Sequence, residues 1–544
     1  MPRQRETPTI RTVHEALNLL TVDQLKPLAL EYVNSEPDNR LRLQRCLISH
    51  ERRLARAWVT SCARQLAYRR SELEAAAKQK DLFGDTTTEA ARARRELPEL
   101  NQRRHELCNL TRVIKTRGEL PFFSFAVHFP ESAERGFDVV VCNPPWVRTH
   151  SWSRSLSAVV RRRFEIGRCG QQIDLALLFL ERALDLLHDG GVLGIILPAK
   201  FIRSLAGTAA RRMLLTRSEI VSVEDHSLDQ KSIFDADSFA ALVVARKCAA
   251  PANSRIATTV VRRNAPPLSF ELRQNDLSDA PWLLVPDALR AALQRMDQNG
   301  VALDLLIRRG VVTGKNDALI LSSVTPRLGN LVSIRAQGFE RAANPSEYEA
   351  VIEENAVRKL VRGCDVHAWN AAQSHYLICQ TTEHRALAYL SRQDCAAPQV
   401  APVCSSHVVA WHDLASNVNA VVIPSRIVAL NTVYFVATDE ATSHLLCAYF
   451  NSLPFRTYAR AIAERAKDAH FRFFAWTMAR VPLPQNWRSF ACADLQEISR
   501  VAHARGSIEE AEQQHLDDVV ARAYRLSRSD CEAIRNYDRW LRGV

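Results

Sequence analysis

One short apolar run ends in a polar, proline-rich turn, and its residue types could do chemistry. This stretch is Phe137–Trp146, with the sequence FDVVVCNPPW. The β-branched residues in Val139–Cys142 predict a strand buried on both faces, as in a parallel sheet. The two prolines stop the strand and hold Asn143 in an extended conformation. Open α/β sheets bind ligands at the carboxyl ends of their strands, so Asn143 stands where a ligand would bind.

The polar groups of this turn suit a planar amino group. The side-chain oxygen of Asn143 and the carbonyl of Pro144 provide two acceptors for its two hydrogens. Trp146 adds a flat face on which the ring that bears the amino group could stack. An ordinary strand-to-loop turn remains an alternative, because Asn-Pro and Pro-Pro are common turn signals.

The residues Asn143, Pro144, Pro145 and Trp146 resemble the catalytic motif of gamma-type adenine-N6 DNA methyltransferases of restriction–modification systems. The resemblance implies that an adenine is flipped out of duplex DNA and that these residues hold it. It also implies direct methylation of the amine by S-adenosylmethionine (SAM). Glutamine methyltransferases that act on proteins share the motif, so the four residues leave the substrate open.

The resemblance assigns roles to further residues. Phe234, just before a predicted strand, would cover the other face of the adenine, although an ordinary buried Phe fits equally well. Asp174 would contact the cofactor, and a helix cap is its alternative role. The loop after the motif would lie beside the DNA, and it carries three adjacent arginines, Arg161, Arg162 and Arg163.

Four later segments resemble, in their order, the specificity domain of TaqI-type methylases, which recognises the DNA target. They are Gly310–Ala318, Arg362–Val366, Asn451–Phe455 and Val481–Pro484. This order favours double-stranded DNA over protein as the substrate. The candidate DNA contacts, chosen for their hydrogen-bond donors, are Thr313, Lys315, Asn316 and Arg362.

The composition is that of a globular protein with a basic surface. The chain has 544 residues, a net charge of +12 and 47% hydrophobic residues, which agrees with a polyanionic partner. No apolar run is long enough to span a membrane. The 13 cysteines form no C-x-x-C pair, so we expect no zinc site and a cytoplasmic protein.

Hydrophobic patterns and the family resemblance together divide the chain into five parts. We expect a helical region (1–117), the C-terminal half of a methyltransferase catalytic domain (118–250), a linker (251–300), a target-recognition domain (301–486) and a helical tail (487–544). In the second part the patterns predict helices at 174–188 and 207–215 and strands at 192–197, 220–224 and 239–246, with Gly190-Gly191 ending the first helix. The predicted fold class is α/β, with a partial Rossmann-like class I methyltransferase sheet followed by an α+β domain.

The glycine-rich SAM loop that the resemblance requires, and the acidic residue of the next strand, are not visible in residues 1–136. Without the strands that carry them, Val139–Cys142 would be a bare apolar edge. We therefore expect that a separate upstream SAM-binding subunit, or a missing N-terminal half, completes the enzyme. The alternatives are a catalytically inactive, truncated DNA-binding specificity module and, less favoured, a protein or RNA methyltransferase.

Overall fold

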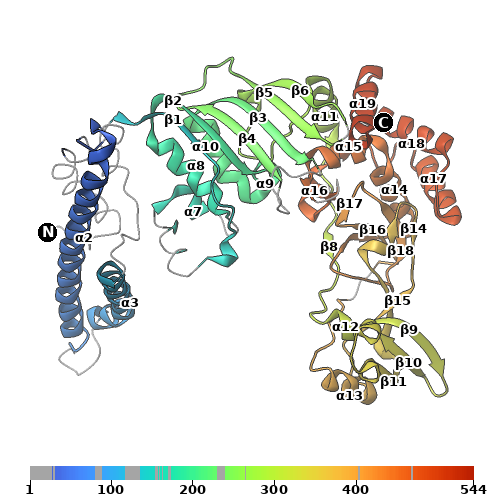
Figure 1. Ribbon diagram of the computed structural model, residues 1–544. Coiled ribbons are helices and arrows are strands. Elements are labelled where there is room, and N and C mark those ends of the chain that lie inside the picture. The colour runs from blue at the N-terminus through green and yellow to red at the C-terminus, as the bar shows by residue number, and fades with distance from the viewer. Residues whose placement is uncertain are drawn as a thin grey trace. The chain divides into compact units, whose positions relative to one another are not determined.

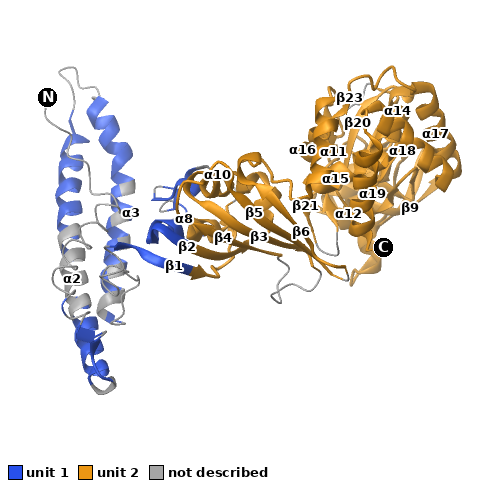
Figure 2. Cartoon of the chain, turned by 90° about the horizontal axis from the view of Figure 1, so that it is seen from above, with its two compact units in different colours: residues 1–140, 152–168, 182–192 blue, residues 141–151, 169–181, 193–544 orange. Residues whose placement is uncertain are grey.

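The computed structural model describes residues 27, 31–32, 34–79, 88–116, 135–152, 157, 160–161, 163–169, 173–229, 239–263, 265–401, 405–466 and 470–543. The chain divides into two compact units, coloured separately in Figure 2. They comprise residues 1–140, 152–168 and 182–192, and residues 141–151, 169–181 and 193–544. Two of the candidate site residues, Arg162 and Phe234, lie outside the described residues.

Two long helices form a hairpin in the first unit. They are α2 (Pro37–Ala76) and α3 (Thr88–Thr116). Pro37 opens α2 at a position where the missing N–H of proline is tolerated. Leu73, Ala93 and Leu100 are buried in one cluster that holds the two helices together. The helical character predicted for this region is confirmed over these ranges.

Six strands form the sheet that carries the motif (Figure 1). Their order is β1-β2-β4-β3-β5-β6. β4 is antiparallel to β3, β5 is parallel to β3, and β6 is antiparallel to β5. The strands are β1 (Phe137–Cys142), β2 (Leu187–Pro198), β3 (Glu219–Leu228), β4 (Ala240–Arg246), β5 (Arg255–Arg262) and β6 (Leu268–Arg273).

The burial expected for β1 is wrong. β1 lies at one edge of the sheet formed by the described strands. Val139 is 57% exposed and Val141 is 80% exposed. The apolar run indicated a central strand, but its side chains meet a neighbouring strand on one side only. This is the apolar edge that the sequence predicts when the upstream strands are not in place.

The helices beside the sheet are α7 (Glu165–Cys169), α8 (Leu175–Leu186), α9 (Lys200–Arg203) and α10 (Thr208–Arg217). Helix α8 ends at Leu186 and β2 begins at the next residue, so the prediction that Gly190-Gly191 ends this helix is wrong. Both glycines instead lie within β2, where Gly190 has φ of +91°. A Cβ on Gly191 would lie 2.9 Å from the carbonyl oxygen of Phe137, so glycine permits a close approach to β1.

The segment 251–300, expected to be a linker with small elements, contains two strands and a helix. β5 and β6 extend the sheet, and α11 (Asp287–Gln298) follows them. Ile256, Thr258 and Val260 alternate with more exposed residues along β5. This period-2 pattern typifies a strand with one buried face, and the surrounding Pro and Asn residues obscured it in the sequence.

The following region is rich in short strands. One sheet has the order β11-β10-β9-β15-β12-β19 and another β18-β16-β20-β8. The strands of these sheets are β8 (Ile307–Arg309), β9 (Ile320–Arg327), β10 (Leu331–Ala336), β11 (Glu349–Glu353), β12 (Val357–Val361), β15 (His375–Ile378), β16 (His407–His412), β18 (Ala420–Pro424), β19 (Val428–Ala429) and β20 (Val433–Thr438).

Three small sheets complete this region. They pair β13 (Val366–His367) with β14 (Asn370–Ala371), β7 (Gly300–Val301) with β23 (Leu483–Pro484), and β22 (Phe471–Arg472) with both β17 (Leu414–Ala415) and β21 (Glu464–Arg465). The pairing of β7 with β23 brings together the two ends of the predicted target-recognition domain.

Helices surround these sheets and form the tail. Those before the tail are α12 (Asn316–Leu319), α13 (His384–Arg392), α14 (Glu440–Asn451), α15 (Leu453–Ile462) and α16 (Ala475–Arg480). The predicted helical tail contains α17 (Cys492–Arg505), α18 (Glu510–Ala523) and α19 (Arg528–Arg542). α17 packs on α14, and α19 packs on α11 and α15, so the tail covers elements from earlier in the chain.

Candidate active site and adjoining basic pocket

The Asn-Pro-Pro-Trp motif leaves β1 at its carboxyl end. Asn143 is exposed, Pro144 is buried and Trp146 is half-buried. Burial raises the pKa of the Cys142 thiol just before the motif, which keeps this group neutral. The buried proline anchors the turn, while the asparagine amide remains accessible to a ligand.

The chain after the motif is fastened to the segment that precedes α8. The N–H of Leu175 donates to the Val147 carbonyl over 2.9 Å, and the N–H of Thr149 donates to the Ile173 carbonyl over 3.0 Å. The Thr149 hydroxyl also donates to that carbonyl and accepts from the N–H of Ile173. These contacts hold the exit of the motif in one place.

Asp174 caps α8. Its Oδ1 accepts a 3.0 Å hydrogen bond from the N–H of Ala176, which satisfies one of the free donors at the helix start. Burial raises the pKa of Asp174, although this hydrogen bond and the nearby cations Arg148 and Lys200 act in the opposite direction. The helix-cap role is therefore confirmed, and Asp174 also lines a pocket.

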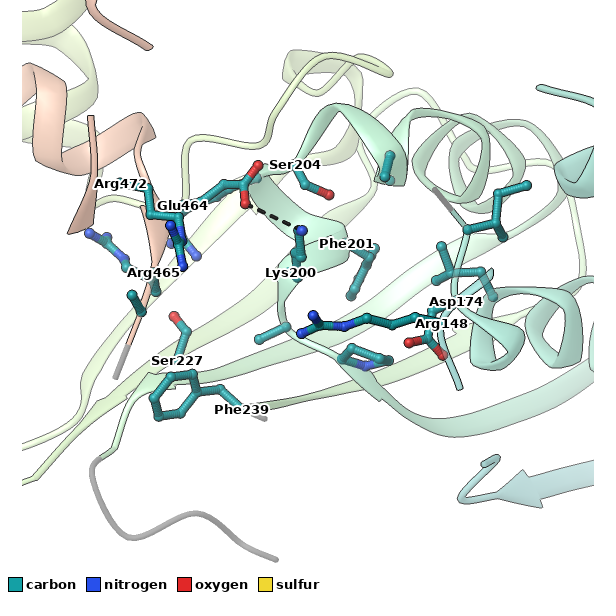
Figure 3. A pocket seen from close by; sticks show the side chains of 18 of the residues that line it. Arg148, Asp174, Lys200, Phe201, Ser204, Ser227, Phe239, Glu464, Arg465 and Arg472 are labelled. Carbon is teal, nitrogen blue, oxygen red and sulfur yellow. Dashed lines mark ion pairs between the residues drawn. The ribbon is translucent and has the colours of Figure 1, made fainter. Parts of the chain in front are cut away.

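This pocket, called the basic pocket below, has a volume of about 790 Å³ (Figure 3). It lies at the carboxyl ends of β2 and β3, where Pro198 and Ser227 line it, and it also takes residues from β21 and β22. Its charged lining residues are Arg148, Asp174, Lys200, Arg203, Glu464, Arg465 and Arg472. Five of these seven are basic, so the pocket is suited to an anion.

Ion pairs organise the walls of the basic pocket. Lys200 Nζ lies 3.8 Å from Glu464 Oε2, a contact drawn in Figure 3. Arg203 Nη1 donates to Asp225 Oδ2 over 2.6 Å, and both side chains are buried. Burial raises the pKa of Glu464, although Lys200 opposes this shift.

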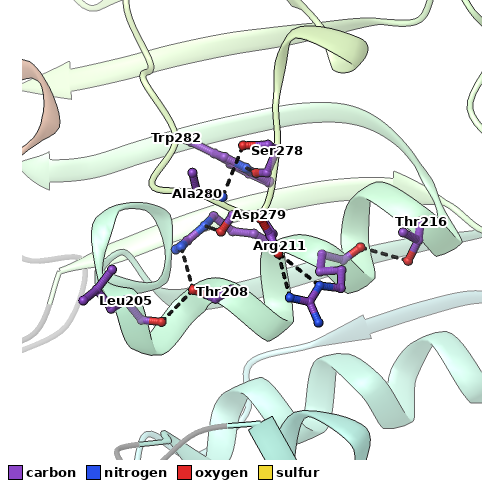
Figure 4. A network of polar contacts seen from close by, with 9 residues as sticks. Leu205, Thr208, Arg211, Thr216, Ser278, Asp279, Ala280 and Trp282 are labelled. Carbon is purple, nitrogen blue, oxygen red and sulfur yellow. Dashed lines mark hydrogen bonds and ion pairs between the residues drawn. The ribbon is translucent and has the colours of Figure 1, made fainter. Parts of the chain in front are cut away.

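A polar network around Arg211 supports the α9 wall of the basic pocket (Figure 4). Figure 4 shows Arg211 beside Thr208 and Asp279. Its guanidinium donates to the carbonyls of Phe201, Ser204 and Asp279. Burial lowers the pKa of Arg211 to about 10, so it stays charged at neutral pH. Arg211 thus ties α10 both to α9 and to the segment after β6.

The other residues that the sequence predicted lie away from the basic pocket. Arg161 and Arg163 are exposed, and Arg163 stacks on the ring of Phe164. Arg362 is held by Asp365 through two 3.0 Å hydrogen bonds. The remaining three lie together at the start of α12, where the Thr313 hydroxyl donates to Asn316 and Lys315 Nζ donates to the Gln393 carbonyl.

Sequence reasoning missed the basic pocket. Lys200 carried a usable signal, because it closely follows the end of a predicted strand, where α/β sheets bind ligands. Arg465 and Arg472 carried none, since they lie more than two hundred residues along the chain from β2. Among the described residues, no group of three or more His, Cys, Asp or Glu side chains could hold a metal ion.

The segment that contains β1 and the motif matches a known family. Residues 57–234 match the Eco57I restriction-modification methylase family. Over 98 residues, or 17% of this chain, the sequence is 32% identical to the type II restriction enzyme and methyltransferase RM.Eco57I of Escherichia coli. The aligned stretch is only 10% of that protein.

Solved structures that are similar to this chain include restriction–modification enzymes. The type IIL restriction-modification enzyme MmeI, solved in complex with DNA, has a TM-score of 0.50 at 8% identity, covering 74% of this chain and 57% of MmeI. The type IIG restriction endonuclease BpuSI has a TM-score of 0.34 at 12% identity, covering 76% of this chain and 55% of BpuSI. The chain therefore spans little more than half of MmeI, with which it shares a fold.

The predicted fold class is confirmed. The chain is an α/β protein with a mixed sheet of parallel and antiparallel strands, preceded by helices and followed by an α+β region and a helical tail. Within the described ranges, no helix combines the length and the apolar character needed to cross a membrane.

Proposed function

We propose that this chain is the catalytic and target-recognition part of a SAM-dependent, site-specific DNA methyltransferase acting on adenine N6 in a restriction–modification or phage-defence system. The observation that carries this proposal is the geometry of the motif within a segment that matches a methylase family. Asn143 is accessible at the carboxyl end of β1, while Pro144 is buried beside it. The accessible amide and the anchored backbone offer two fixed acceptors for an amino group.

The proposed roles follow from the hydrogen-bonding capacity of each group. The Asn143 side-chain oxygen and the Pro144 carbonyl accept the two hydrogens of the adenine amine. These contacts orient the nitrogen lone pair toward the methyl donor, and Trp146 stacks on the extruded base. Pro145 keeps the turn rigid, and Phe234 covers the opposite face of the base. Most of the rate enhancement comes from positioning and orientation.

SAM would supply the methyl group as an electrophile in a single transfer. The described residues offer it an incomplete site. Asp174, the one candidate contact, uses Oδ1 to cap α8, which leaves less of its carboxylate for a ligand. We propose that the glycine-rich loop that would hold the cofactor comes from another part of the enzyme, while the motif of this chain holds the acceptor base.

The edge of β1 supports a second component. Val139 and Val141 are exposed along this edge, and an apolar edge strand readily pairs with a further strand. We propose that a SAM-binding half of the sheet pairs here, supplied by an upstream subunit or by a preceding segment. Pairing of this half with β1 would bury both valines and place the cofactor beside Asn143.

Double-stranded DNA is the proposed substrate. The basic pocket, next to the segment that leaves the motif, provides positive charge for the phosphate backbone. Further contacts are proposed for Arg161, Arg162 and Arg163 and, in the target-recognition region, for Thr313, Lys315, Asn316 and Arg362. The second candidate function, favoured by the incomplete cofactor site, is a DNA-binding specificity module without catalysis.

Methyl transfer from tritiated SAM to unmethylated duplex DNA tests the two functions. The chain is assayed alone and with the product of the adjacent upstream gene, as wild type and as Asn143→Ala. We expect label in DNA with the wild-type pair, and at least a hundredfold less with Asn143→Ala at unchanged DNA affinity. If wild type and Asn143→Ala bind DNA equally and neither transfers label, the chain is a specificity module without catalysis. Label in protein or RNA alone would contradict DNA as the substrate.

A further inference from the structure

Four side chains meet at the inner end of the basic pocket. Arg203 comes from α9, Asp225 and Ser227 come from β3, and Arg465 comes from β21. Arg203, Asp225 and Ser227 are no more than 2% exposed. Arg203, Ser227 and Arg465 also line the pocket, so buried polar groups border an open cavity.

The hydrogen bonds within this cluster use only part of its donors. Asp225 is fully engaged, because Oδ2 accepts from Arg203 Nη1 and Oδ1 accepts from the N–H of Ser227 over 3.0 Å. Arg465 Nη1 donates to the Arg460 carbonyl over 2.6 Å. Arg465 also stacks on the ring of Phe471, with its guanidinium carbon 4.4 Å from the ring centre. These contacts fix the orientation of both guanidinium groups.

Five buried donors have no hydrogen-bond partner among the described residues. They are Nε and Nη2 of Arg203, Nε and Nη2 of Arg465, and the Ser227 hydroxyl. Leaving a buried donor unpaired is costly, and more so when the group is charged. Such donors are usually satisfied, so five around one pocket indicate a ligand that accepts hydrogen bonds.

The charges in the cluster also favour an anionic ligand. Two guanidinium groups face the single carboxylate of Asp225, which leaves one uncompensated positive charge. Burial lowers the pKa of Arg465 to about 10, and the positive charge of Arg203 adds to this shift. The fold therefore holds two guanidinium cations close together in spite of their electrostatic repulsion. Glu464 lines the pocket as well, but its carboxylate pairs with Lys200.

We propose that the inner end of the basic pocket binds a phosphate group, with Arg203, Arg465 and Ser227 as its hydrogen-bond donors. Guanidinium forks match the oxygens of a phosphate, and the serine hydroxyl supplies a further donor. A bound phosphate would balance the charge and satisfy the buried donors. Lys200 and Arg472, which also line the pocket, would add longer-range attraction.

The position of the pocket favours a phosphodiester of the DNA as the source of this phosphate. The pocket is lined by Arg148, Thr149 and His150, which closely follow the motif proposed to hold the flipped adenine. A phosphate close to the extruded nucleotide could therefore enter it. This inference rests on the proposed function for the identity of the nucleic acid, while the anion site itself follows from the buried donors.

DNA binding and phosphate binding are measured separately. Fluorescence anisotropy with a labelled duplex is followed over a range of salt concentrations for wild type, Ser227→Ala, Arg465→Gln and Arg255→Gln. Arg255 is an exposed arginine of β5 outside the pocket, so its variant controls for the loss of charge. Unfolding temperatures with inorganic phosphate, and with sodium chloride at equal ionic strength, show whether a free anion binds.

We expect Arg465→Gln to weaken DNA binding about tenfold and to reduce the salt slope by about 1, as the loss of one phosphate contact does. Ser227→Ala removes a hydroxyl without a partner, so it should fold normally and still weaken DNA binding. Arg255→Gln should keep the wild-type slope. Phosphate should raise the unfolding temperature of wild type and raise it less in Ser227→Ala.

Phosphate could stabilise the wild type while Ser227→Ala and Arg465→Gln bind DNA as the wild type does. This result would contradict a DNA phosphodiester as the ligand and would support a site for free phosphate or a nucleotide. Wild-type behaviour of Ser227→Ala in both measurements would overturn the anion site. Neither readout requires methyl transfer, so DNA binding through this site can be established even if no methylation is found.

Discussion

Arg203 and Asp225 form a buried ion pair that joins α9 to β3, with Nη1 of the arginine 2.6 Å from Oδ2 of the aspartate. Burial alone would raise the pKa of Asp225, but the charge of Arg203 lowers it below its ordinary value. The pair holds one wall of the basic pocket to the sheet. Its removal should affect both stability and anion binding.

Replacing Asp225 with Ala should destabilise the protein by about 3–5 kcal/mol, because it leaves Arg203 and Arg465 buried without a counter-charge. Urea unfolding at pH 7 measures this loss. The matched control is Glu271→Ala, which breaks an exposed pair with Arg255 and should cost less than about 1 kcal/mol. Equal effects of the two substitutions would contradict the role given to the buried pair.

Gly207 should not tolerate a side chain. A Cβ at this position would lie 2.0 Å from the Phe201 carbonyl oxygen and 2.5 Å from Arg211 Nη1. Gly207→Ala should therefore disturb the Arg211 network and lower stability by about 1–3 kcal/mol, as overpacking does. Gly194→Ala is the control, since its Cβ would find Val141 at an ordinary 3.7 Å. Thermal unfolding of both variants checks the difference.

Asp517 should make stability depend on pH. Burial raises the pKa of its carboxyl to about 6, against hydrogen bonds from the N–H of Leu453 and from Gln513. A folded-state pKa above the unfolded value means that the folded state binds more protons. The contribution of Asp517 to stability is therefore largest below the unfolded pKa, near 4, and is lost as the pH rises through 6.

Asp517→Asn removes this titration and keeps an oxygen that can accept from Leu453. Relative to wild type, the variant should gain of order 1–3 kcal/mol between pH 4 and pH 8. Urea unfolding at both pH values measures the change. Glu510→Gln, which removes an exposed carboxylate at the start of α18, is the control. A difference between Asp517→Asn and wild type that does not change with pH would contradict this account.

Val141→Lys should block assembly with the proposed SAM-binding half without unfolding the chain. Val141 is 80% exposed on β1, so the change should alter stability by less than about 0.5 kcal/mol. A lysine on an edge strand opposes pairing with a further strand. Val312→Lys, at a residue that is 64% exposed elsewhere, is the control. Co-purification with the upstream gene product measures assembly. If Val141→Lys assembles as well as wild type, the edge of β1 is not the contact.

The strands and helices next to the motif could be predicted because their signals are local. The apolar run of β1, the helical spacing of α8 and the apolar strand before Pro198 each occupy a few consecutive residues. The ends of α8 were predicted less well, since Gly190-Gly191 read as a helix stop although both glycines lie in β2.

The basic pocket could not be predicted because its parts are distant in the sequence. Arg203 and Asp225 are 22 residues apart, and Arg465 lies 240 residues after Asp225. No periodic pattern joins residues at such separations. Arg362 illustrates the same limit, since its pairing with Asp365 shows only in the structure. Residue types indicated which groups could act, and the fold determined which of them meet.

The most direct test of the account is to identify the methylated nucleoside. DNA from cells that produce this chain together with the product of the adjacent upstream gene is digested to nucleosides and analysed by mass spectrometry. The account predicts N6-methyladenine with wild type and none above background with Asn143→Ala, when both proteins accumulate equally. Methylated cytosine, or N6-methyladenine that persists in the Asn143→Ala cells, would contradict the assignment of Asn143 and Pro144 as the acceptors of the adenine amine.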